Sequence, residues 1–120
     1  MYATNYHRAN SLDDAAQKLA GAEDGKFLAG GQTLLATMKQ RLAAPSDLVD
    51  VTKLADLHGI DVTADTVTIG AATRHADVAG SKAVRDAIPA LAALAGLIGD
   101  PAVRHMGTIG GSIANNDPAA

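Results

Sequence analysis

Two adjacent glycines stand between an apolar stretch and a segment with helical spacing, and this arrangement limits what the first half of the chain can form. The apolar stretch is "KFLAG", residues 26–30, and the glycine pair occupies positions 30–31. The segment that follows has helical periodicity and is expected to continue until Pro45. Its apolar face is expected to consist of Leu35, Met38 and Leu42. The sequence therefore predicts a strand, a tight turn and a helix.

The same alternation of strand and helix extends over residues 1–52. "NYHRAN" predicts an edge strand, and "DLVDVT", residues 47–52, predicts a buried one. Between them, "SLDDAAQKLAG" predicts a helix that begins at Ser11 with the capping-box spacing and ends at Gly21. The apolar face of this helix is expected to be Leu12, Ala15, Ala16 and Leu19. The resulting β-α-β-α-β order predicts a small α/β lobe with some parallel pairing.

The second half of the sequence changes in pattern. Residues 59–73 alternate and predict a hairpin, and residues 73–99 predict helices with Thr73 and Ser81 as N-caps. A separate helix is expected to start at Pro89. Its inward positions are expected to be Leu91, Leu94, Leu97 and Ile98. We expect residues 101–107 to be a connector and residues 108–115 to be a strand interrupted by a glycine turn. Together the two halves predict an α+β chain of two lobes, residues 1–55 and 56–120.

Composition excludes several classes of function. With three aromatic residues in 120 and a net charge of −3, the chain lacks the stacking platform and the basic surface of nucleic-acid binders. Without cysteine it cannot hold a disulfide, a thiolate zinc site or an iron–sulfur cluster. No apolar signal region and no transmembrane segment are visible, so a cytoplasmic location is expected.

Both glycine pairs offer chemistry for an anion. Backbone N–H groups at the start of a helix can hold a phosphate, and glycine lets the phosphate approach closely. "AGGQT" at 29–33 has this pattern, and "TIGGS" at 108–112 repeats it with flanking hydroxyls. Each pair alone is more often a simple turn, and neither matches the dinucleotide fingerprint or the P-loop. Arg104 and His105 either serve an anion or form a solvated connector, and the four scattered histidines predict no metal site.

The two glycine segments and their surroundings resemble a known family. "LAGGQTLL" at 28–35 and "IGDPAVRHMGTIGGSIANNDPAA" at 98–120 are similar to the FAD-binding medium subunit of molybdenum hydroxylases, which include carbon monoxide dehydrogenase and xanthine dehydrogenase. Residues 11–20, 47–60 and 67–78 resemble the same subunit, so the resemblance covers the whole chain.

The resemblance implies a cofactor and the residues that bind it. The implied fold is the vanillyl-alcohol-oxidase (PCMH) type, in which two α/β lobes bind FAD and a C-terminal lobe follows. In that family both glycine segments contact the FAD pyrophosphate through backbone N–H groups. Carried over, the FAD-binding residues are Ala29, Gly30, Gly31, Gln32, Thr33, Thr108, Ile109, Gly110, Gly111 and Ser112. His105 and Met106 depart from the family pattern just before the second segment.

The implied function is electron transfer within a larger complex. Electrons would pass from a molybdenum-binding large subunit, through an iron–sulfur small subunit, to FAD here and then to an external acceptor. The molybdenum cofactor and the iron–sulfur clusters would belong to those partner subunits, and no side chain here is expected to act as acid or base. The alternatives are a scaffold module without a cofactor and a stand-alone FAD oxidoreductase of the same fold.

Four further expectations concern truncation of the chain, FAD binding by these residues alone, self-association, and a substitution at Gly110. "NNDPAA" follows the second glycine segment directly, so we expect a chain truncated before the C-terminal lobe. We expect these 120 residues alone to bind FAD weakly or not at all, and to self-associate through apolar surface near Ile109 and Ile113. In a full-length version, Gly110→Val is expected to weaken FAD binding by on the order of a few kcal/mol.

Overall fold

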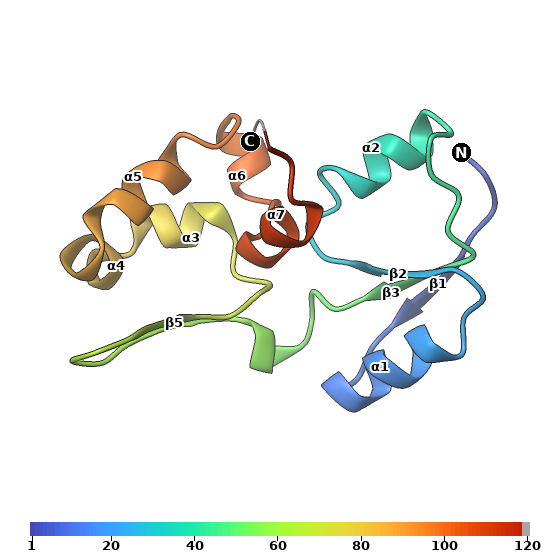
Figure 1. Cartoon of the computed structure of the whole chain (residues 1–120), viewed down its shortest axis with the longest axis horizontal. Helices are drawn as coiled ribbons and strands as arrows, with labels where there is room; N and C mark the ends of the chain where they lie inside the picture. The colour runs from blue at the N-terminus through green and yellow to red at the C-terminus, as the bar shows by residue number, and fades with distance from the viewer. Residues whose placement is uncertain (119–120) are drawn as a thin grey trace. The chain divides into compact units, whose positions relative to one another are not determined.

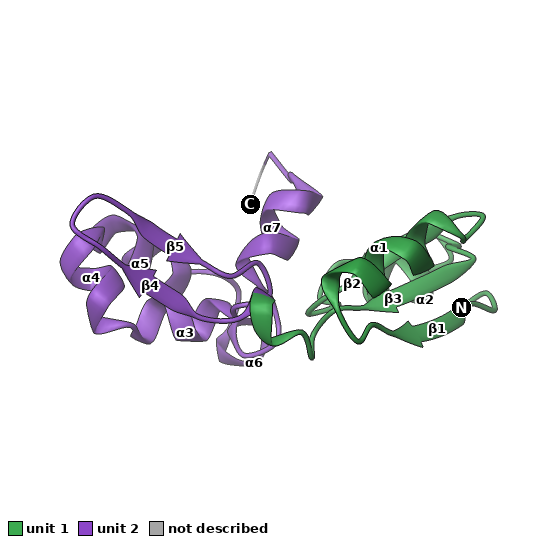
Figure 2. Ribbon diagram, turned by 90° about the horizontal axis from the view of Figure 1, so that it is seen from below, with its two compact units in different colours: residues 1–56 green, residues 57–120 purple. Residues whose placement is uncertain are grey.

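The chain forms two units, each built around its own small sheet (Figure 2). The computed structural model describes residues 1–118. Unit 1 is Met1–Asp56 and unit 2 is Leu57–Ala120. No helix in the described part of the chain is both long enough and apolar enough to cross a membrane.

Unit 1 is a three-stranded parallel sheet with two helices. Its elements are β1 (Asn5–Arg8), α1 (Leu12–Ala20), β2 (Gly25–Leu28), α2 (Leu34–Lys39) and β3 (Asp47–Asp50). The strand order is β1-β3-β2 and both pairs are parallel. Figure 1 shows α1 and α2 on opposite sides of this sheet. The predicted β-α-β-α-β order, the parallel pairing and the edge position of the first strand are confirmed.

The central strand and the first helix show why unit 1 forms. Because β3 has a neighbour on each side, its Leu48 and Val49 are buried, as predicted. Ser11 caps α1, since its hydroxyl accepts the N–H of Asp14 at 3.0 Å. The predicted apolar face of α1 is only partly right, because Ala15 is buried whereas Leu12 and Ala16 are exposed.

The helix after the first glycine pair is shorter than predicted. It ends at Lys39, well before Pro45, and Leu42 lies beyond it with 74% of its surface exposed. Arg41 adopts a left-handed conformation with φ of 60°. Two bonds then close the helix end, from the N–H of Leu42 to the carbonyl of Thr37 and from the N–H of Arg41 to that of Met38. This is a Schellman motif, which normally uses glycine, so the sequence carried no usual stop signal.

Unit 2 combines, over its described residues 57–118, a hairpin with five short helices. The strands are β4 (Ile60–Val62) and β5 (Val67–Ile69), which pair antiparallel as predicted. A 3-10 turn, η1 (Ala55–Leu57), precedes them. The helices are α3 (His75–Gly80), α4 (Lys82–Ala87), α5 (Pro89–Gly96), α6 (Pro101–Arg104) and α7 (Ile109–Asn115).

The core of unit 2 uses small residues of α5 where large ones were expected. Ala92 and Ala95 are buried with Val78 and Val84, and the hairpin packs against this cluster. Of the predicted inward face, Leu91 packs against this cluster and Ile98 is half-buried, whereas Leu94 and Leu97 are 60% and 80% exposed, so the prediction was right only in part. Short side chains at Ala92 and Ala95 allow α5 to approach α3 and α4 closely.

Three local predictions in unit 2 were also wrong. Residues 101–107 were expected to be a connector but contain α6, which Asp100 caps by accepting the N–H of Val103 at 2.8 Å. Residues 108–115 were expected to be a strand but form α7, which Thr108 caps. Thr73 does not cap α3, because its hydroxyl bonds both backbone groups of Gly59. Ser81 caps α4 as predicted.

Candidate functional site

The first glycine segment, residues 29–33, is the turn from β2 into α2. Gly31 has a φ of +73°, a conformation that residues with a side chain rarely adopt. A Cβ on Gly31 would also lie 2.7 Å from the Cδ1 atom of Leu35. The backbone conformation therefore favours glycine here, and a side chain would also require Leu35 to move.

The backbone donors of this turn have no partner within the chain. Among the described residues, none of the N–H groups of residues 30–33 donates a hydrogen bond. The side chain of Gln32 adds a donor, which lies 3.3 Å from the carbonyl of Gly30. Successive backbone N–H groups that are not bonded internally can bind an anion. The turn thus has the donor set that a phosphate needs.

A buried carboxylate lies at the same end of the unit 1 sheet. Asp50 is the register partner of Leu28, the last residue of β2. Its carboxylate accepts hydrogen bonds from the Tyr6 hydroxyl, from the N–H of Thr52 at 2.8 Å and from the Thr52 hydroxyl at 2.6 Å. Burial raises the pKa of Asp50, but the hydrogen bonds from Thr52 and Tyr6 outweigh burial and hold the pKa below its ordinary value. Asp50 thereby ties β1 to the end of β3.

The second glycine segment, residues 108–112, differs because its N–H groups are already bonded. Those of Ile109 and Gly110 donate to the carbonyls of Thr73 and Ala71, at 3.1 and 2.8 Å. The N–H of Gly111 donates to the Thr108 hydroxyl at 3.1 Å, and the N–H of Ser112 donates to the Thr108 carbonyl. In this structure the backbone of the second segment therefore holds unit 2 together.

Residues 71–75 and 107–110 form a clasp between two distant parts of unit 2. Besides the two bonds from residues 109 and 110, the N–H of His75 donates to the carbonyl of Gly107 at 3.0 Å. Arg74 and Thr108 form an antiparallel bridge at its centre. A Cβ on Gly110 would lie 2.6 Å from the carbonyl oxygen of Ala71. Glycine at 110 therefore has a packing role that sequence reasoning did not find.

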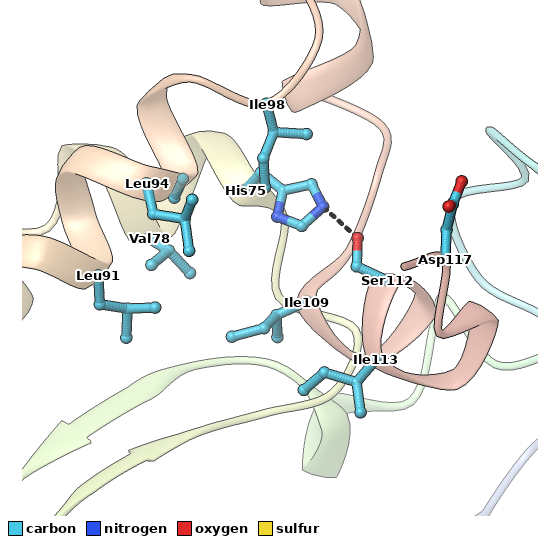
Figure 3. A pocket seen from close by; sticks show the side chains of 10 residues that line it. His75, Val78, Leu91, Leu94, Ile98, Ile109, Ser112, Ile113 and Asp117 are labelled. Carbon is cyan, nitrogen blue, oxygen red and sulfur yellow. Dashed lines mark hydrogen bonds between the residues drawn. The ribbon is translucent and has the colours of Figure 1, made fainter. Parts of the chain in front are cut away.

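A pocket of about 300 Å³ lies inside unit 2, between α3, α5 and α7 (Figure 3). Most of its lining is aliphatic. The aliphatic side chains include Val78, Leu91, Leu94, Ala95, Ile109 and Ile113. The side chains of Ile109 and Ser112, two residues of the second glycine segment, therefore line this pocket.

His75 supplies the buried polar group of the pocket. It is 4% exposed, and its Nε2 atom lies 3.0 Å from the hydroxyl oxygen of Ser112. Burial lowers the pKa of His75, which favours the neutral imidazole. Sequence reasoning considered this histidine only as a metal ligand. No sequence signal would have paired the two residues, because 37 positions separate them.

The remaining candidates are occupied locally. The guanidinium of Arg104 donates to the carbonyls of Ile98 and Gly99, at 3.1 and 3.2 Å. The Nδ1 atom of His105 lies 2.6 Å from the carbonyl of Pro101. Within residues 1–118, no three histidine or acidic side chains gather in a way that could hold a metal ion.

Comparison with known proteins places this geometry in a family. Residues 2–120 match the family described as "FAD binding domain in molybdopterin dehydrogenase". The chain belongs to this family. The match spans both glycine segments and the pocket, so the family assignment covers every candidate described above.

Individual relatives agree with the family assignment. The chain is 44% identical to the carbon monoxide dehydrogenase medium chain of Hydrogenophaga pseudoflava, over 94% of this chain and 40% of that protein. It is 39% identical to the glyceraldehyde dehydrogenase medium chain of Sulfolobus acidocaldarius, over 97% of this chain and 41% of that protein.

A solved structure agrees with the described fold. The crystal structure of quinoline 2-oxidoreductase from Pseudomonas putida 86 superposes with a TM-score of 0.95 at 34% identity, over 99% of this chain and 42% of that one. The chain thus spans about two fifths of the length of the relatives that it matches.

Proposed function

We propose that the chain is the FAD-binding part of an electron-transfer subunit in a molybdenum-containing hydroxylase. The match of residues 2–120 to the FAD-binding family carries this proposal. The relatives named above are medium chains of dehydrogenases, which supports a role beside other subunits. The protein would receive electrons from iron–sulfur clusters and pass them to an external acceptor.

The first glycine segment fits the pyrophosphate of FAD. Residues 30–33 present backbone N–H groups without internal partners, and Gln32 and Thr33 add polar side chains. In the proposed function, Ala29 to Thr33 bind the pyrophosphate, and residues 108–112 contribute contacts through groups other than the N–H groups of residues 109–112, which are bonded within unit 2. FAD supplies the redox chemistry, since the flavin ring accepts and releases electrons. The part of this chain is to hold the cofactor.

The partners and the complete fold follow from the same proposal. A large subunit would carry the molybdenum cofactor and a small subunit the iron–sulfur clusters. The complete FAD-binding subunit would adopt the vanillyl-alcohol-oxidase (PCMH) type of fold. Ile113 is 72% exposed on α7, and we propose that it belongs to an apolar surface through which copies of these 120 residues associate.

A titration with three ligands tests the pyrophosphate assignment. The ¹⁵N-labelled chain is titrated with ADP, FAD and riboflavin while its amide resonances are recorded. We expect ADP and FAD to shift the amides of residues 30–33 and riboflavin to leave them unchanged, because riboflavin has no phosphate. We expect both active ligands to bind weakly, because much of a large cofactor must be buried for tight binding.

Two variants control this titration. Gly31→Ala strains the turn and forces a contact with Leu35, so the shifts caused by ADP should vanish. Gly80→Ala, at a site where a Cβ meets no atom within 4 Å, should keep them. If neither ADP nor FAD shifts the amides of residues 30–33, the assignment of the pyrophosphate to this turn is contradicted. One tightly held FAD per chain would contradict the expectation of weak binding.

A further inference from the structure

The pocket of unit 2 is apolar at one end and polar at the other. Figure 3 shows Val78, Leu91 and Leu94 on one side, and Ser112 and Asp117 on the opposite side. The pocket volume of about 300 Å³ is at the lower end of the range that holds small molecules. A ligand that matches this pocket is therefore small, mostly apolar and polar at one position.

The His75–Ser112 pair defines which polar group would fit. If Nε2 of His75 accepts a hydrogen bond from the Ser112 hydroxyl, the serine oxygen can accept a hydrogen bond from a ligand. If Nε2 carries the proton, the serine hydroxyl can donate instead. A ligand group that can both donate and accept satisfies the pair in either tautomer. Hydroxyl and lactam groups have this property.

The charges around the pocket exclude an anionic ligand. No lysine or arginine is among the side chains that line it, within the described part of the chain. An anionic ligand would therefore lose its hydration in the pocket without gaining a positively charged partner. Burial favours the neutral form of His75, so the histidine supplies no compensating positive charge. The ligand must therefore be neutral.

We propose that this pocket binds a small neutral apolar molecule that carries one hydroxyl or lactam group, and that this group hydrogen-bonds to the His75–Ser112 pair. The pocket is open to solvent, since Leu94 and Ile113 are 60% and 72% exposed, and its aliphatic side chains from α3, α5 and α7 contact the apolar body of the ligand. The inference goes beyond the proposed function, since it concerns the side chains of the pocket, including Ile109 and Ser112, whereas the backbone donors of residues 30–33 take no part in it.

The test compares three probes that share one ring system. They are 2-naphthol, which is neutral with a hydroxyl; 2-naphthoate, which is an anion; and naphthalene, which has no polar group. Binding of each probe to the full chain is measured by equilibrium dialysis, which is unaffected by the tryptophan that two of the variants below introduce. We expect 2-naphthol to bind about tenfold or more tightly than either other probe.

Variants locate the binding. Ile113→Trp places a large ring at the pocket wall and should weaken 2-naphthol binding about tenfold or more. Leu97→Trp is the matched control, since Leu97 is equally exposed and apolar but does not line the pocket, and it should change binding by less than about twofold. Ser112→Ala should bring the affinity for 2-naphthol down to that for naphthalene and leave naphthalene binding unchanged.

Three results would overturn the proposal. Equal affinities for 2-naphthol and 2-naphthoate would show that the polar end of the pocket does not distinguish a neutral hydroxyl group from an anion. Absence of 2-naphthol binding would show that the pocket is closed or covered by protein. Displacement of bound 2-naphthol by FAD would assign the pocket to the flavin. These results leave the amide shifts of residues 30–33 with ADP unaffected, so failure here is distinct from failure of the proposed function.

Discussion

Adding one methyl group at Gly110 should destabilise unit 2 even in the absence of any ligand. The Cβ of Gly110→Ala would lie 2.6 Å from the carbonyl oxygen of Ala71 and 2.7 Å from its Cβ. That carbonyl also accepts the N–H of Gly110 at 2.8 Å, so the substitution pushes away the acceptor of its own hydrogen bond. The clasp between residues 71–75 and 107–110 must open or shift.

The expected size follows from three terms. Overpacking costs about 1–3 kcal/mol, and a weakened buried hydrogen bond adds about 1 kcal/mol. Alanine regains about 1 kcal/mol over glycine inside a helix. The net loss in the free energy of unfolding is about 2 kcal/mol, which lowers the urea midpoint by roughly 1 M. Gly80→Ala, where the Cβ meets nothing within 4 Å, should instead stabilise unit 2 by about 0.5 kcal/mol.

The distribution of aromatic residues provides an internal control. Tyr2, Tyr6 and Phe27 all lie in unit 1, and unit 2 has no tyrosine, tryptophan or phenylalanine. Urea unfolding followed by circular dichroism reports mainly on the five helices of unit 2, whereas tyrosine fluorescence reports on unit 1. We expect Gly110→Ala to lower the urea midpoint detected by circular dichroism and to leave the midpoint detected by tyrosine fluorescence unchanged. Equal stability of Gly110→Ala and Gly80→Ala would refute the packing role of Gly110, and the glycine would then be explained by ligand binding alone.

Three further predictions use the same two probes. Because the folded pKa of Asp50 lies below its unfolded value, its carboxylate stabilises unit 1 above about pH 4, and this contribution is lost as the pH falls through the folded pKa. Asp50→Asn should therefore lower the tyrosine-detected midpoint at neutral pH and reduce its loss in acid, and an unchanged acid profile would contradict the assignment. For His75, whose pKa burial lowers, unit 2 should lose stability as the pH falls from about 6.5 toward the folded pKa, and His75→Gln should flatten this part of the profile. Ser11→Ala should cost unit 1 about 1 kcal/mol and leave the dichroism of unit 2 unchanged, because Ser11 caps α1.

The order of elements in unit 1 could be predicted because its signals are local. The glycine turn after β2, the cap at Ser11 and the apolar pair Leu48–Val49 are each visible within a few residues. The end of α2 could not be predicted in the same way, since Arg41 occupies a left-handed position that glycine usually fills. The end of a helix or strand can be predicted from the sequence when the residue at that end is of the type usually found there.

Unit 2 was harder to predict because tertiary contacts decide its structure. Glycine disfavours helix, so "TIGGSIAN" was predicted as a strand, whereas the Thr108 cap and the approach of Ala71 to Gly110 favour α7. Which side chains of α5 face the core depends on how closely α3 and α4 approach it. The spacing of apolar residues in the sequence carries no information about that distance.

Some features of the candidate site could likewise be inferred from the sequence, and others could not. The N–H groups of residues 30–33 belong to one continuous turn, so their chemistry could be inferred from the sequence. The pairing of His75 with Ser112, and the use of the second glycine segment as a structural element, arise only when distant segments meet. Both features therefore required the structure.

The clasp in unit 2 also has a consequence for the rates of folding and unfolding. Closing it brings residues 71–75 to residues 107–110 and encloses α3, α4, α5 and α6 in one loop. The entropy lost in closing so long a loop is recovered only when the enclosed helices have already packed together. The clasp should then form after the folding transition state, so weakening it speeds unfolding and leaves the folding rate almost unchanged. The lifetime of folded unit 2, more than the speed at which it folds, would be determined by the second glycine segment.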